Sequence, residues 1–592
     1  MPINSFKHQT NGYAFGLGGL KRLVFYVIPT LLFLPNILFA QTSNYSQINF
    51  RSPMDIPLLT SGTFGELRKN HFHTGIDFKT NNTEGKNIYA IADGYVSRIK
   101  VSSRGYGNAV YIDHPNGFTS VYAHLSKFDE QLSNYVRAKQ YELKQFEIDV
   151  NPDANQLYYK KGDILAFSGN SGSSAGPHLH FEIRETDTEF PLNPLLFNFD
   201  VVDTQKPTLN GFYVYEIKNG VAQEPDKSLK LIFENGINTL AKVITVSTPE
   251  VAFAVKAQDR QNGSSHNNGV YKIIMQVNNQ PYYSFDFDKL SFAENRYLNA
   301  HIDYKEKIDH KKTYHRLFKL PGNNLSIYET RINDGIVNLS DGTIKDISID
   351  ITDQSGNSKK LNFQVRYQSP EQLASSVNCA YPMPYYQENY FSADGFELKL
   401  PSGVLYKDIC FTYEVNEPIS KSIRSKVHTI HNKNTGAHIN YLMAIQPDEI
   451  AKKIPEKTIV CYLDYNNKEE CLTTIFDGKY FRAENRYFGK HYLKIDTIAP
   501  VVNAKNFKRG DQLKANPTLK FSVKEKHAGL KTYNANLNGS WAILAYDSGD
   551  KEFTFTDFTN GVSGKNYFTI TTEDKKGNKN TFETYFILPW PI

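Results

Sequence analysis

Residues 176–182 read Gly-Pro-His-Leu-His-Phe-Glu, and the alternation of apolar and polar residues continues to position 184. Side chains two residues apart in a strand point to the same face, so the pattern predicts a strand that directs His178 and His180 into one cleft. A loop with glycines at 169, 172 and 176 and serines between them precedes this strand, and glycine permits a close approach of the backbone. The stretch therefore predicts a histidine-lined site on one face of a β-sheet.

Two motifs upstream complete the set of candidate residues. In His-Thr-Gly-Ile-Asp at 73–77, a glycine separates His73 from Asp77, so a turn can direct both side chains to one point. The motif Tyr-Ala-His-Leu at 122–125 supplies His124. A catalytic zinc ion takes three nitrogen or oxygen ligands from the protein and keeps one position open for water, with a base nearby. The histidines and Asp77 therefore predict a catalytic zinc site, in which only three of the five residues can be ligands.

The sequence from 49 to about 194 is predicted to form a compact β unit. Turn signals at 93–94, 105–108 and 115–117 separate apolar segments that predict strands over 95–101, 109–113 and 118–124. Short strands between glycine turns indicate an antiparallel sheet or a barrel-like core.

Residues 127–160 interrupt this pattern. Phe128, Leu132, Val136 and Leu143 recur at near-helical spacing, which predicts an insertion of one or two helices before a further strand at 163–168. Because the insertion follows His124 directly, we expect it either to cap the cleft or to pack on the outside of the domain.

The order of these motifs resembles that of the lysostaphin/LytM-type zinc endopeptidases, which cleave bacterial cell-wall peptides. The resemblance covers about residues 61–195 and implies metal-assisted peptide hydrolysis with one zinc ion. Carried over by position, the metal ligands are His73, Asp77 and His180, and the catalytic residues, which assist the water and the tetrahedral intermediate, are His124 and His178. The family usually has Thr before the Gly-Pro pair. This chain has Ala175 there, a mild change in a loop that leaves the five positions intact.

Other residues near the motifs are weaker candidates. Asn108 and Tyr122 are expected to contact substrate, whereas Arg68 and Glu182 are expected to be structural. Glu182 shares the strand face of the paired histidines, so it can also contact an imidazole from behind. A lone histidine is usually structural or solvated, and this is the prediction for His71, His114, His266, His301, His310, His315, His428, His431, His438, His491 and His527.

Length and composition indicate several folded β domains. A chain of 592 residues is too long for one core and corresponds to roughly four domains. Apolar residues make up 40% of it and charged residues 22%, as in folded proteins, and the abundance of Tyr and Phe with scarce Met favours strands. The net charge of +5 is small for this length and gives no case for nucleic-acid binding. The fold class is therefore predicted as mainly β.

The N-terminus is predicted to be a secretory signal over residues 1–40. Lys21 and Arg22 precede an apolar run from 23 to 40, and polar residues follow at once, which favours cleavage after Ala40. Leu38, at the −3 position, is larger than usual, so the cleavage point stays open. The alternative is an uncleaved membrane anchor, because the run approaches spanning length. We expect an exported protein, in the periplasm or cell envelope or secreted.

Beyond residue 200 the chain is predicted to be β-rich, and two short motifs each occur twice in it. Asp-Thr-x-x-Pro at 203–207 and 496–500 opens two segments, and Asp-x-x-Gly-Asn at 353–357 and 574–578 precedes their final strands. A metallopeptidase domain over 41–200 is therefore followed by a β-sandwich-like domain over 201–367, a β-rich domain over 368–495 and an immunoglobulin-like sandwich over 496–592.

The four cysteines all lie in one C-terminal segment, at Cys379, Cys410, Cys461 and Cys471. No C-x-x-C motif occurs, so a structural role is predicted rather than a second metal site. Export permits disulfides, but four cysteines allow three connectivities and the spacing does not select one, and reduced thiols remain an alternative.

The leading functional prediction is an exported murein endopeptidase that cleaves the peptide cross-bridges of peptidoglycan. Bonds around D-alanine and a diamino acid are the expected substrate, and the C-terminal β domains are expected to position the enzyme or bind a cell-envelope protein. One alternative is a catalytically silent protein that binds peptidoglycan or activates another hydrolase, although such relatives usually lack the zinc ligands. The other alternative is an endopeptidase acting on glycine-rich proteins.

Overall fold

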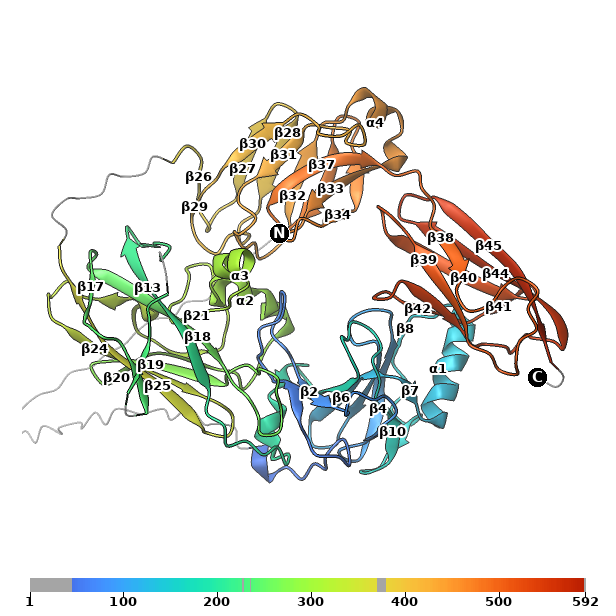
Figure 1. Cartoon of the computed structure of the whole chain (residues 1–592), viewed down its shortest axis with the longest axis horizontal. Coiled ribbons are helices and arrows are strands. Elements are labelled where there is room, and N and C mark those ends of the chain that lie inside the picture. The colour runs from blue at the N-terminus through green and yellow to red at the C-terminus, as the bar shows by residue number, and fades with distance from the viewer. Residues whose placement is uncertain (1–44, 226–227, 235, 370–378, 590–592) are drawn as a thin grey trace, which may run out of the picture. The chain divides into compact units, whose positions relative to one another are not determined.

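The computed structural model describes residues 45–225, 228–234, 236–369 and 379–589 (Figure 1). Strands dominate these residues and helices are few and short, so the prediction of a mainly β fold is confirmed. No helix in the described ranges is both long and apolar enough to cross a membrane. The signal segment predicted over 1–40 lies outside the described residues.

The N-terminal unit is built on a nine-stranded antiparallel sheet in the order β1-β2-β11-β6-β5-β4-β8, with β12 beside β11 and β9 beside β4. A three-stranded antiparallel sheet has the order β3-β10-β7. The bounds are β1 Thr60–Gly62, β2 Ile76–Lys79, β3 Asn87–Tyr89, β4 Gly94–Val101, β5 Asn108–Asp113, β6 Phe118–Leu125, β7 Lys127–Phe128, β8 Ile148–Val150, β9 Tyr158–Tyr159, β10 Ile164–Phe167, β11 His178–Glu185 and β12 Pro191–Leu192, with short 3-10 turns η1 Tyr45–Gln47 and η2 Pro194–Phe197.

Strand β11 is held in its register by the alternation of its side chains. Leu179, Phe181 and Ile183 are fully buried in the main core of the unit, and burying each contributes about 1.5–3 kcal/mol. A slip by one residue would turn these side chains away from the core and bring the polar ones in. The register places His180 opposite Asp77 of β2 on one side and opposite Ala123 of β6 on the other.

The predicted helical insertion is only half helical, which corrects the expectation of helix across 127–160. Helix α1 spans Glu130–Leu143, with the Asp129 carboxylate accepting from the amide of Leu132, and it ends at Lys144, where φ is 51°. The remaining residues form the short strands β8 and β9, which both pair with β4. Asn-Pro at 151–152 breaks helical geometry, and Ile148 and Val150 alternate with a polar residue as strand residues do.

The buried face of α1 joins the core of the N-terminal unit. Leu132 is fully buried and Val136 is 7% exposed, and both belong to the same apolar cluster as Phe128 and Leu165. These contacts favour the alternative in which the insertion packs on the domain.

The second unit consists of two sheets. One has the order β14-β13-β18-β21 with β23 beside β18, and the other has the order β15-β16-β25-β24-β19-β20-β22 with β17 beside β25. The bounds are β13 Thr208–Lys218, β14 Val221–Ala222, β15 Ile232–Glu234, β16 Ile237–Thr239, β17 Ile244–Val246, β18 Glu250–Gln258, β19 Lys272–Val277, β20 Gln280–Asp286, β21 His315–Arg316, β22 Tyr328–Arg331, β23 Val337–Asn338, β24 Lys345–Thr352 and β25 Ser358–Tyr367, with η3 Phe292–Tyr297, α2 Leu298–His301, α3 Tyr304–His310 and η4 Ile332–Gly335.

The core of the second unit also takes in residues from the loop between β1 and β2. Phe64 and Phe72 are buried in the apolar cluster formed by Phe253, Phe285 and Phe287, and not in the core of the N-terminal unit. The loop that leads to His73 is therefore anchored by the sandwich that follows in sequence.

The last unit repeats the topology of the second. Its sheets have the orders β38-β39-β43-β42 and β41-β40-β44-β45, and the second of these matches β20-β19-β24-β25 strand for strand. The bounds are β38 Val501–Ala504, β39 Leu519–Lys524, β40 Leu530–Leu537, β41 Ser540–Ala542, β42 Leu544–Asp547, β43 Glu552–Phe555, β44 Gly564–Asp574 and β45 Lys579–Leu588. The motifs that occur twice in the sequence thus lie in two units that share a sheet topology.

In the sequence, a third unit lies between the second unit and the last one. It has two five-stranded sheets and a short additional pair of strands. The sheet orders are β27-β28-β32-β36-β35 and β30-β31-β37-β33-β34, and β26 pairs with β29. The bounds are β26 Pro382–Met383, β27 Asn389–Ala393, β28 Phe396–Leu400, β29 Ile409–Cys410, β30 Tyr413–Asn416, β31 Val427–Ile430, β32 Tyr441–Ile445, β33 Thr458–Leu463, β34 Glu469–Cys471, β35 Thr474–Phe476, β36 Phe481–Asn485 and β37 Gly489–Ile495, with α4 Glu449–Lys453 and η5 Pro455–Lys457.

The cysteines of this third unit form two disulfides. Cys379 pairs with Cys410, and Cys461 pairs with Cys471 across β33 and β34. The cysteines are therefore structural, as predicted, and the connectivity that the spacing left open is settled.

Candidate metal centre

Three side-chain atoms meet at one point between β2 and β11. His73 Nε2 lies 3.0 Å from Asp77 Oδ1 and 3.0 Å from His180 Nδ1, and the latter two atoms are 2.9 Å apart. All three residues are at least nine-tenths buried. Asp77 and His180 are cross-strand partners, and His73 reaches them from the loop before β2. The residues predicted as ligands are thus brought together.

Hydrogen bonds on the outer side of each ring fix which nitrogen faces this point. His73 Nδ1 lies 2.8 Å from the carbonyl oxygen of Thr63, and His180 Nε2 lies 2.9 Å from Glu182 Oε1. Both neighbours accept only, so each of these nitrogens carries a proton. His73 Nε2 and His180 Nδ1 therefore face each other and the Asp77 carboxylate. Burial lowers the pKa of His180, but Asp77 and Glu182 outweigh it and raise that pKa to about 9, so this negative surrounding also favours a cation bound between the three atoms.

His124 and His178 lie beside this triangle with their rings 4.8 Å apart, centroid to centroid. His178 Nδ1 is 2.8 Å from the carbonyl oxygen of Gly176, and His124 Nδ1 is 2.8 Å from that of Ser171. Each ring therefore donates from Nδ1 and leaves Nε2 free. His178 Nε2 lies 3.4 Å from Asp77 Oδ1, so it faces the triangle.

A break in the regularity of β6 turns His124 toward the site. Ala123 pairs with His180 and shares its face, so strict alternation would direct residue 124 to the opposite face. Instead, the register between β5 and β6 shifts, and His124 has a φ of 59°, a conformation uncommon for residues other than glycine. Burial, with His180 and His178 adding to it, lowers the pKa of His124 to about 3, so the ring is neutral at neutral pH.

Glu182 connects His180 to a buried polar network. Its carboxylate accepts from Thr74 Oγ1 at 2.7 Å and from the Tyr106 hydroxyl, and Arg184 Nε donates to it at 2.7 Å. Burial raises the pKa of Glu182, but Arg184 and His180 outweigh it and hold that pKa below the ordinary value. The Tyr106 ring also stacks on His180 with centroids 5.2 Å apart. Glu182 is therefore an ionised group that orients His180.

The second oxygen of Asp77 is occupied by Arg68. Arg68 Nη2 donates to Asp77 Oδ2 at 2.7 Å, while Oδ1 faces the two histidines. Burial raises the pKa of Asp77, yet His73, His178 and His180 hold it well below the ordinary value. Arg68 thus fixes the carboxylate in the orientation that a ligand requires, which is consistent with the structural role predicted for it.

Tyr122 is a correction to the sequence analysis. It is fully buried, and its hydroxyl accepts from the amide of Ile91 and contacts Ser120. Because it alternates with Ala123, it points to the core and offers no surface to a substrate. Asn108 is half-buried, and its side-chain amide donates to the carbonyl oxygen of Leu125 at 3.0 Å, which supports the end of β6. A contact of Asn108 with substrate stays a prediction.

Tyr106 and Thr74 were not singled out from the sequence, although both bind Glu182. Thr74 lies inside the His-Thr-Gly-Ile-Asp motif, and Tyr106 lies between two glycines in a turn. The sequence indicated this network only through Glu182, which lies two residues after His180 and therefore on the same face of the strand. The other histidines of the described residues do not join the three-atom triangle.

Comparison with known proteins finds peptidases that match the segment holding these motifs. The model of peptidase family M23 matches residues 71–141. The DD-carboxypeptidase/endopeptidase Mpg of Neisseria meningitidis is 35% identical over 123 residues, which are 21% of this chain and 22% of that protein. This chain carries a peptidase M23 domain.

Other relatives match the same M23 domain. Lysostaphin of Staphylococcus staphylolyticus is 30% identical over 111 residues, 19% of this chain and 18% of that protein. A solved structure of the catalytic domain of the prophage-encoded M23 protein EnpA of Enterococcus faecalis has 25% identity and a TM-score of 0.19, covering 24% of this chain and 95% of that one. The chain thus spans about a fifth of the curated relatives it matches. A Zu5-like domain model matches residues 380–496, the third unit.

M23 metallopeptidases depend on zinc, and the donor set here fits that ion. Two nitrogens and one carboxylate oxygen are ligands that zinc accepts. At zinc–ligand distances of about 2.0–2.1 Å, tetrahedral ligands lie about 3.3 Å apart. The three edges of 2.9–3.0 Å reach this value with shifts of a few tenths of an ångström.

Proposed function

We propose that the protein is an exported zinc metalloendopeptidase that hydrolyses the peptide cross-bridges of peptidoglycan. The single observation that carries this proposal is the convergence of His73 Nε2, Asp77 Oδ1 and His180 Nδ1 within 3.0 Å of one another, with the Nε2 atom of His178 at 3.4 Å from the same carboxylate oxygen. The names of two relatives, a carboxypeptidase/endopeptidase and lysostaphin, support a cell-wall peptide as the substrate.

His73, Asp77 and His180 would hold the zinc ion. When bound, zinc polarises a carbonyl group and makes water a stronger nucleophile at neutral pH. The chain's own residues orient this site: Thr63 and Glu182 fix the two rings, and Arg68 fixes the carboxylate.

His124 and His178 are proposed to move protons and bind the reacting oxygen. Each ring has its Nδ1 hydrogen bonded to a backbone carbonyl, so only Nε2 is available to the substrate. A neutral ring can accept a proton at Nε2 from water and later donate it to the leaving amine. The protonated form can also donate a hydrogen bond to a developing oxyanion. Two such rings 4.8 Å apart allow one to serve each role.

Incubation with purified sacculi tests the proposal. The zinc-loaded protein should release soluble muropeptides, and mass spectrometry should identify the cleaved bond as a peptide bond of the cross-bridge. Release should stop with a chelator and resume with added zinc. His178→Gln should bind zinc as the wild type does and lose activity by about 10²–10⁴-fold, the usual contribution of a proton-transferring group. If this variant solubilises sacculi at the wild-type rate, the assignment of His178 is wrong.

Two matched substrates separate the leading proposal from its alternatives. Binding to sacculi without release of fragments would indicate a silent peptidoglycan-binding protein. Cleavage of glycine-rich proteins while sacculi stay intact would indicate an endopeptidase that acts on such proteins.

The remaining parts of the proposal concern location. The basic and apolar segment over 1–40 supports export, and two disulfides fit an oxidising compartment. The three C-terminal units are proposed to position the M23 domain at the wall or to bind an envelope protein.

A further inference from the structure

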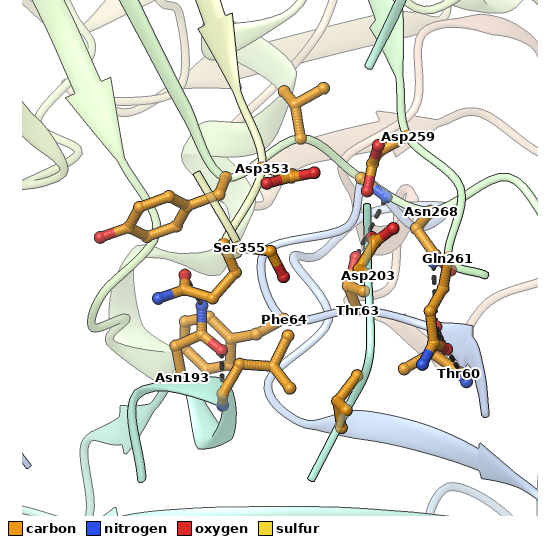
Figure 2. A pocket seen from close by; sticks show the side chains of 16 residues that line it. Thr60, Thr63, Phe64, Asn193, Asp203, Asp259, Gln261, Asn268, Asp353 and Ser355 are labelled. Atoms are coloured by element: carbon orange, nitrogen blue, oxygen red, sulfur yellow. Dashed lines mark hydrogen bonds between the residues drawn. The ribbon is translucent and has the colours of Figure 1, made fainter. Parts of the chain in front are cut away.

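A second cluster of donor atoms lies in the second unit, outside the histidine site. Asp203 precedes β13, Asp259 follows β18 and Asp353 follows β24, and each offers a carboxylate oxygen within 4.8 Å of the others. With Asn268 they line a cavity of about 30 Å³ (Figure 2). This volume holds one water molecule or one ion.

Two of the cavity-lining side chains are buried without a hydrogen-bond partner for an oxygen. Asp259 is 5% exposed and Asn268 is 3% exposed, and Oδ1 of each has no partner. The Asn268 amide nitrogen donates to Thr60 Oγ1 at 2.9 Å, which assigns the other atom as the carbonyl oxygen. Buried oxygens are normally satisfied by protein, water or an ion, so these two point to a missing ligand.

The cluster also lacks a positive charge. No Lys, Arg or His nitrogen of the described residues lies within 4 Å of Asp203, Asp259 or Asp353 in an ion pair. Burial, together with Asp353 and Asp203, raises the pKa of Asp259 to about 8. Burial raises the pKa of the other two carboxyls as well. Three carboxyls so close together require either a proton or a cation.

The repeated unit at the C-terminus shows how the chain can satisfy the same constellation by itself. Asp496, Glu525 and Asp574 occupy the corresponding positions and also lie within 4.8 Å. There, backbone amides donate to both oxygens of Asp496 and of Glu525, and Asn578 and the backbone amide of Lys576 donate to Asp574. In the first copy Asn357 donates to Asp353 in the same way, so the difference lies at Asp259, the counterpart of Glu525, whose Oδ1 has no partner.

The two copies differ in charge as well as in hydrogen bonding. The turn that carries Asp574 continues with Lys575 and Lys576, where the turn after Asp353 has Gln354 and Ser355. Lys576 is close enough for Asp496 and Asp574 to act on its pKa, which burial lowers. Among the described residues, a lysine thus lies near the carboxylates of the C-terminal copy, whereas the first copy has Ser355 at the corresponding position.

We propose that Asp203, Asp259, Asp353 and the Asn268 carbonyl bind a divalent cation of the calcium class. All the offered atoms are oxygens, which Ca²⁺ prefers, and Ca²⁺ tolerates irregular coordination completed by water. The cation neutralises the carboxylates and satisfies both unpartnered oxygens.

The site is connected to the M23 domain. Gln261 Oε1 accepts from the backbone amide of Thr60 at 2.7 Å, and the side-chain amide of Asn268 donates to the Thr60 hydroxyl. Thr60 is the first residue of β1, which pairs with the Asp77-bearing strand β2. A cation that orders the loop from 259 to 268 therefore also stiffens the support of β1.

Calcium binding to the full-length mature chain, with zinc bound, tests the proposal by isothermal titration with CaCl₂. One site is expected, with a dissociation constant of about 10⁻⁴–10⁻³ M, as in extracellular modules. Asp259→Asn, which keeps the shape of the side chain, should weaken binding by at least tenfold. Glu525→Gln in the C-terminal copy should leave it unchanged. Absence of binding at ten times the upper end of that range would overturn the proposal, as would wild-type binding by Asp259→Asn.

A second variant covers the case in which Asp259→Asn does not fold. Ser355→Lys gives the first copy the lysine found at the corresponding position of the C-terminal copy, so it should abolish calcium binding while raising the melting temperature in calcium-free buffer. Calcium should raise the melting temperature of the wild type but not that of Ser355→Lys. If calcium stabilises both proteins equally, the ion binds elsewhere and the proposal is wrong.

Discussion

The chemistry of the histidine site depends on which nitrogen of each ring carries the proton. Thr63 and Glu182 accept from the outer nitrogens of His73 and His180, and so direct the inner nitrogens of both rings at Asp77. Backbone carbonyls do the same for His124 and His178 but leave their Nε2 atoms uncommitted. In the proposed mechanism, hydrogen bonds behind the rings thus separate the two histidines that would hold the metal from the two that would transfer protons.

Glu182 is expected to act as a positioning residue for zinc. Glu182→Gln removes the negative charge behind His180 and can present an amide N–H to a ring nitrogen that itself needs an acceptor. Partners of this kind usually contribute 10- to 100-fold to metal affinity. We therefore expect zinc affinity, measured by competition with a chelator, to fall by about that factor.

The matched control for this variant is Glu189→Gln, since the Glu189 side chain is 70% exposed. It should leave zinc affinity unchanged. Equal affinities of Glu182→Gln and the wild type would show that Glu182 does not orient His180.

His491 in the third unit is expected to make stability dependent on pH. It is fully buried, with Nδ1 3.0 Å from the Gly489 carbonyl oxygen and Nε2 2.9 Å from the Asn485 amide nitrogen, and burial lowers its pKa to about 4. The unfolded chain, with a His pKa near 6.5, binds more protons between pH 4 and 6.5. The stabilising contribution is therefore complete above about pH 6.5 and is lost as the pH falls toward 4.

Between pH 7 and pH 5 this loss amounts to about 2 kcal/mol for a single histidine with that shift. Hydrogen–deuterium exchange of β37, corrected for the intrinsic rate, should show a smaller pH dependence in His491→Gln than in the wild type. An unchanged dependence would mean that folding does not lower the pKa of His491.

Helix α1 lies in the predicted insertion, yet its buried face is part of the core of the N-terminal unit. Leu132 is fully buried in the cluster that also holds β10 residues, so Leu132→Ala should destabilise the N-terminal unit by about 2–5 kcal/mol. Thermal denaturation should show a lower melting temperature, while Asn134→Ala on the exposed face should change it little. If Leu132→Ala raises activity on small peptides without loss of stability, α1 covers the cleft instead.

Regular alternation and turn residues were enough to predict most strands of the N-terminal unit. The segments predicted at 95–101, 109–113, 118–124 and 163–168 correspond to β4, β5, β6 and β10 within a residue or two. The second half of the insertion was missed because its apolar residues are sparse and its strands β8 and β9 are only two or three residues long. Such strands depend on pairing with β4, which local sequence does not reveal.

The motifs indicated all five candidate residues, which the structure brings together, but the residues that support them were not predicted. The β11 alternation places His178 and His180, whereas the orientation of His124 requires a bulge and a positive φ that no pattern announces. Tyr122 belongs to the same motif as His124 and was predicted to contact substrate, but its side chain is fully buried in the core. The network of Tyr106, Thr74 and Glu182 joins residues far apart in sequence and appears only in the fold.

For the molecule as a whole, zinc is expected to be a stabilising ligand as well as a cofactor. An ion that binds the folded state at 100–1,000 times its dissociation constant adds about 2.7–4.1 kcal/mol to the free energy of unfolding. Chelation should therefore lower the melting transition of the N-terminal unit. Asp77→Asn should melt at the same temperature with and without chelator, because it lacks a ligand. A chelator effect of the same size in Asp77→Asn would place the ion elsewhere.

Anomalous X-ray diffraction at the zinc edge, from crystals of the full chain grown with zinc, is the most direct measurement of the central claim. We expect one strong peak in the M23 domain, about 2.0–2.2 Å from His73 Nε2, Asp77 Oδ1 and His180 Nδ1, with the Nε2 atoms of His124 and His178 facing its open side. A peak bonded to His124 or His178 in place of one of these three, or no peak at this position, would contradict the account.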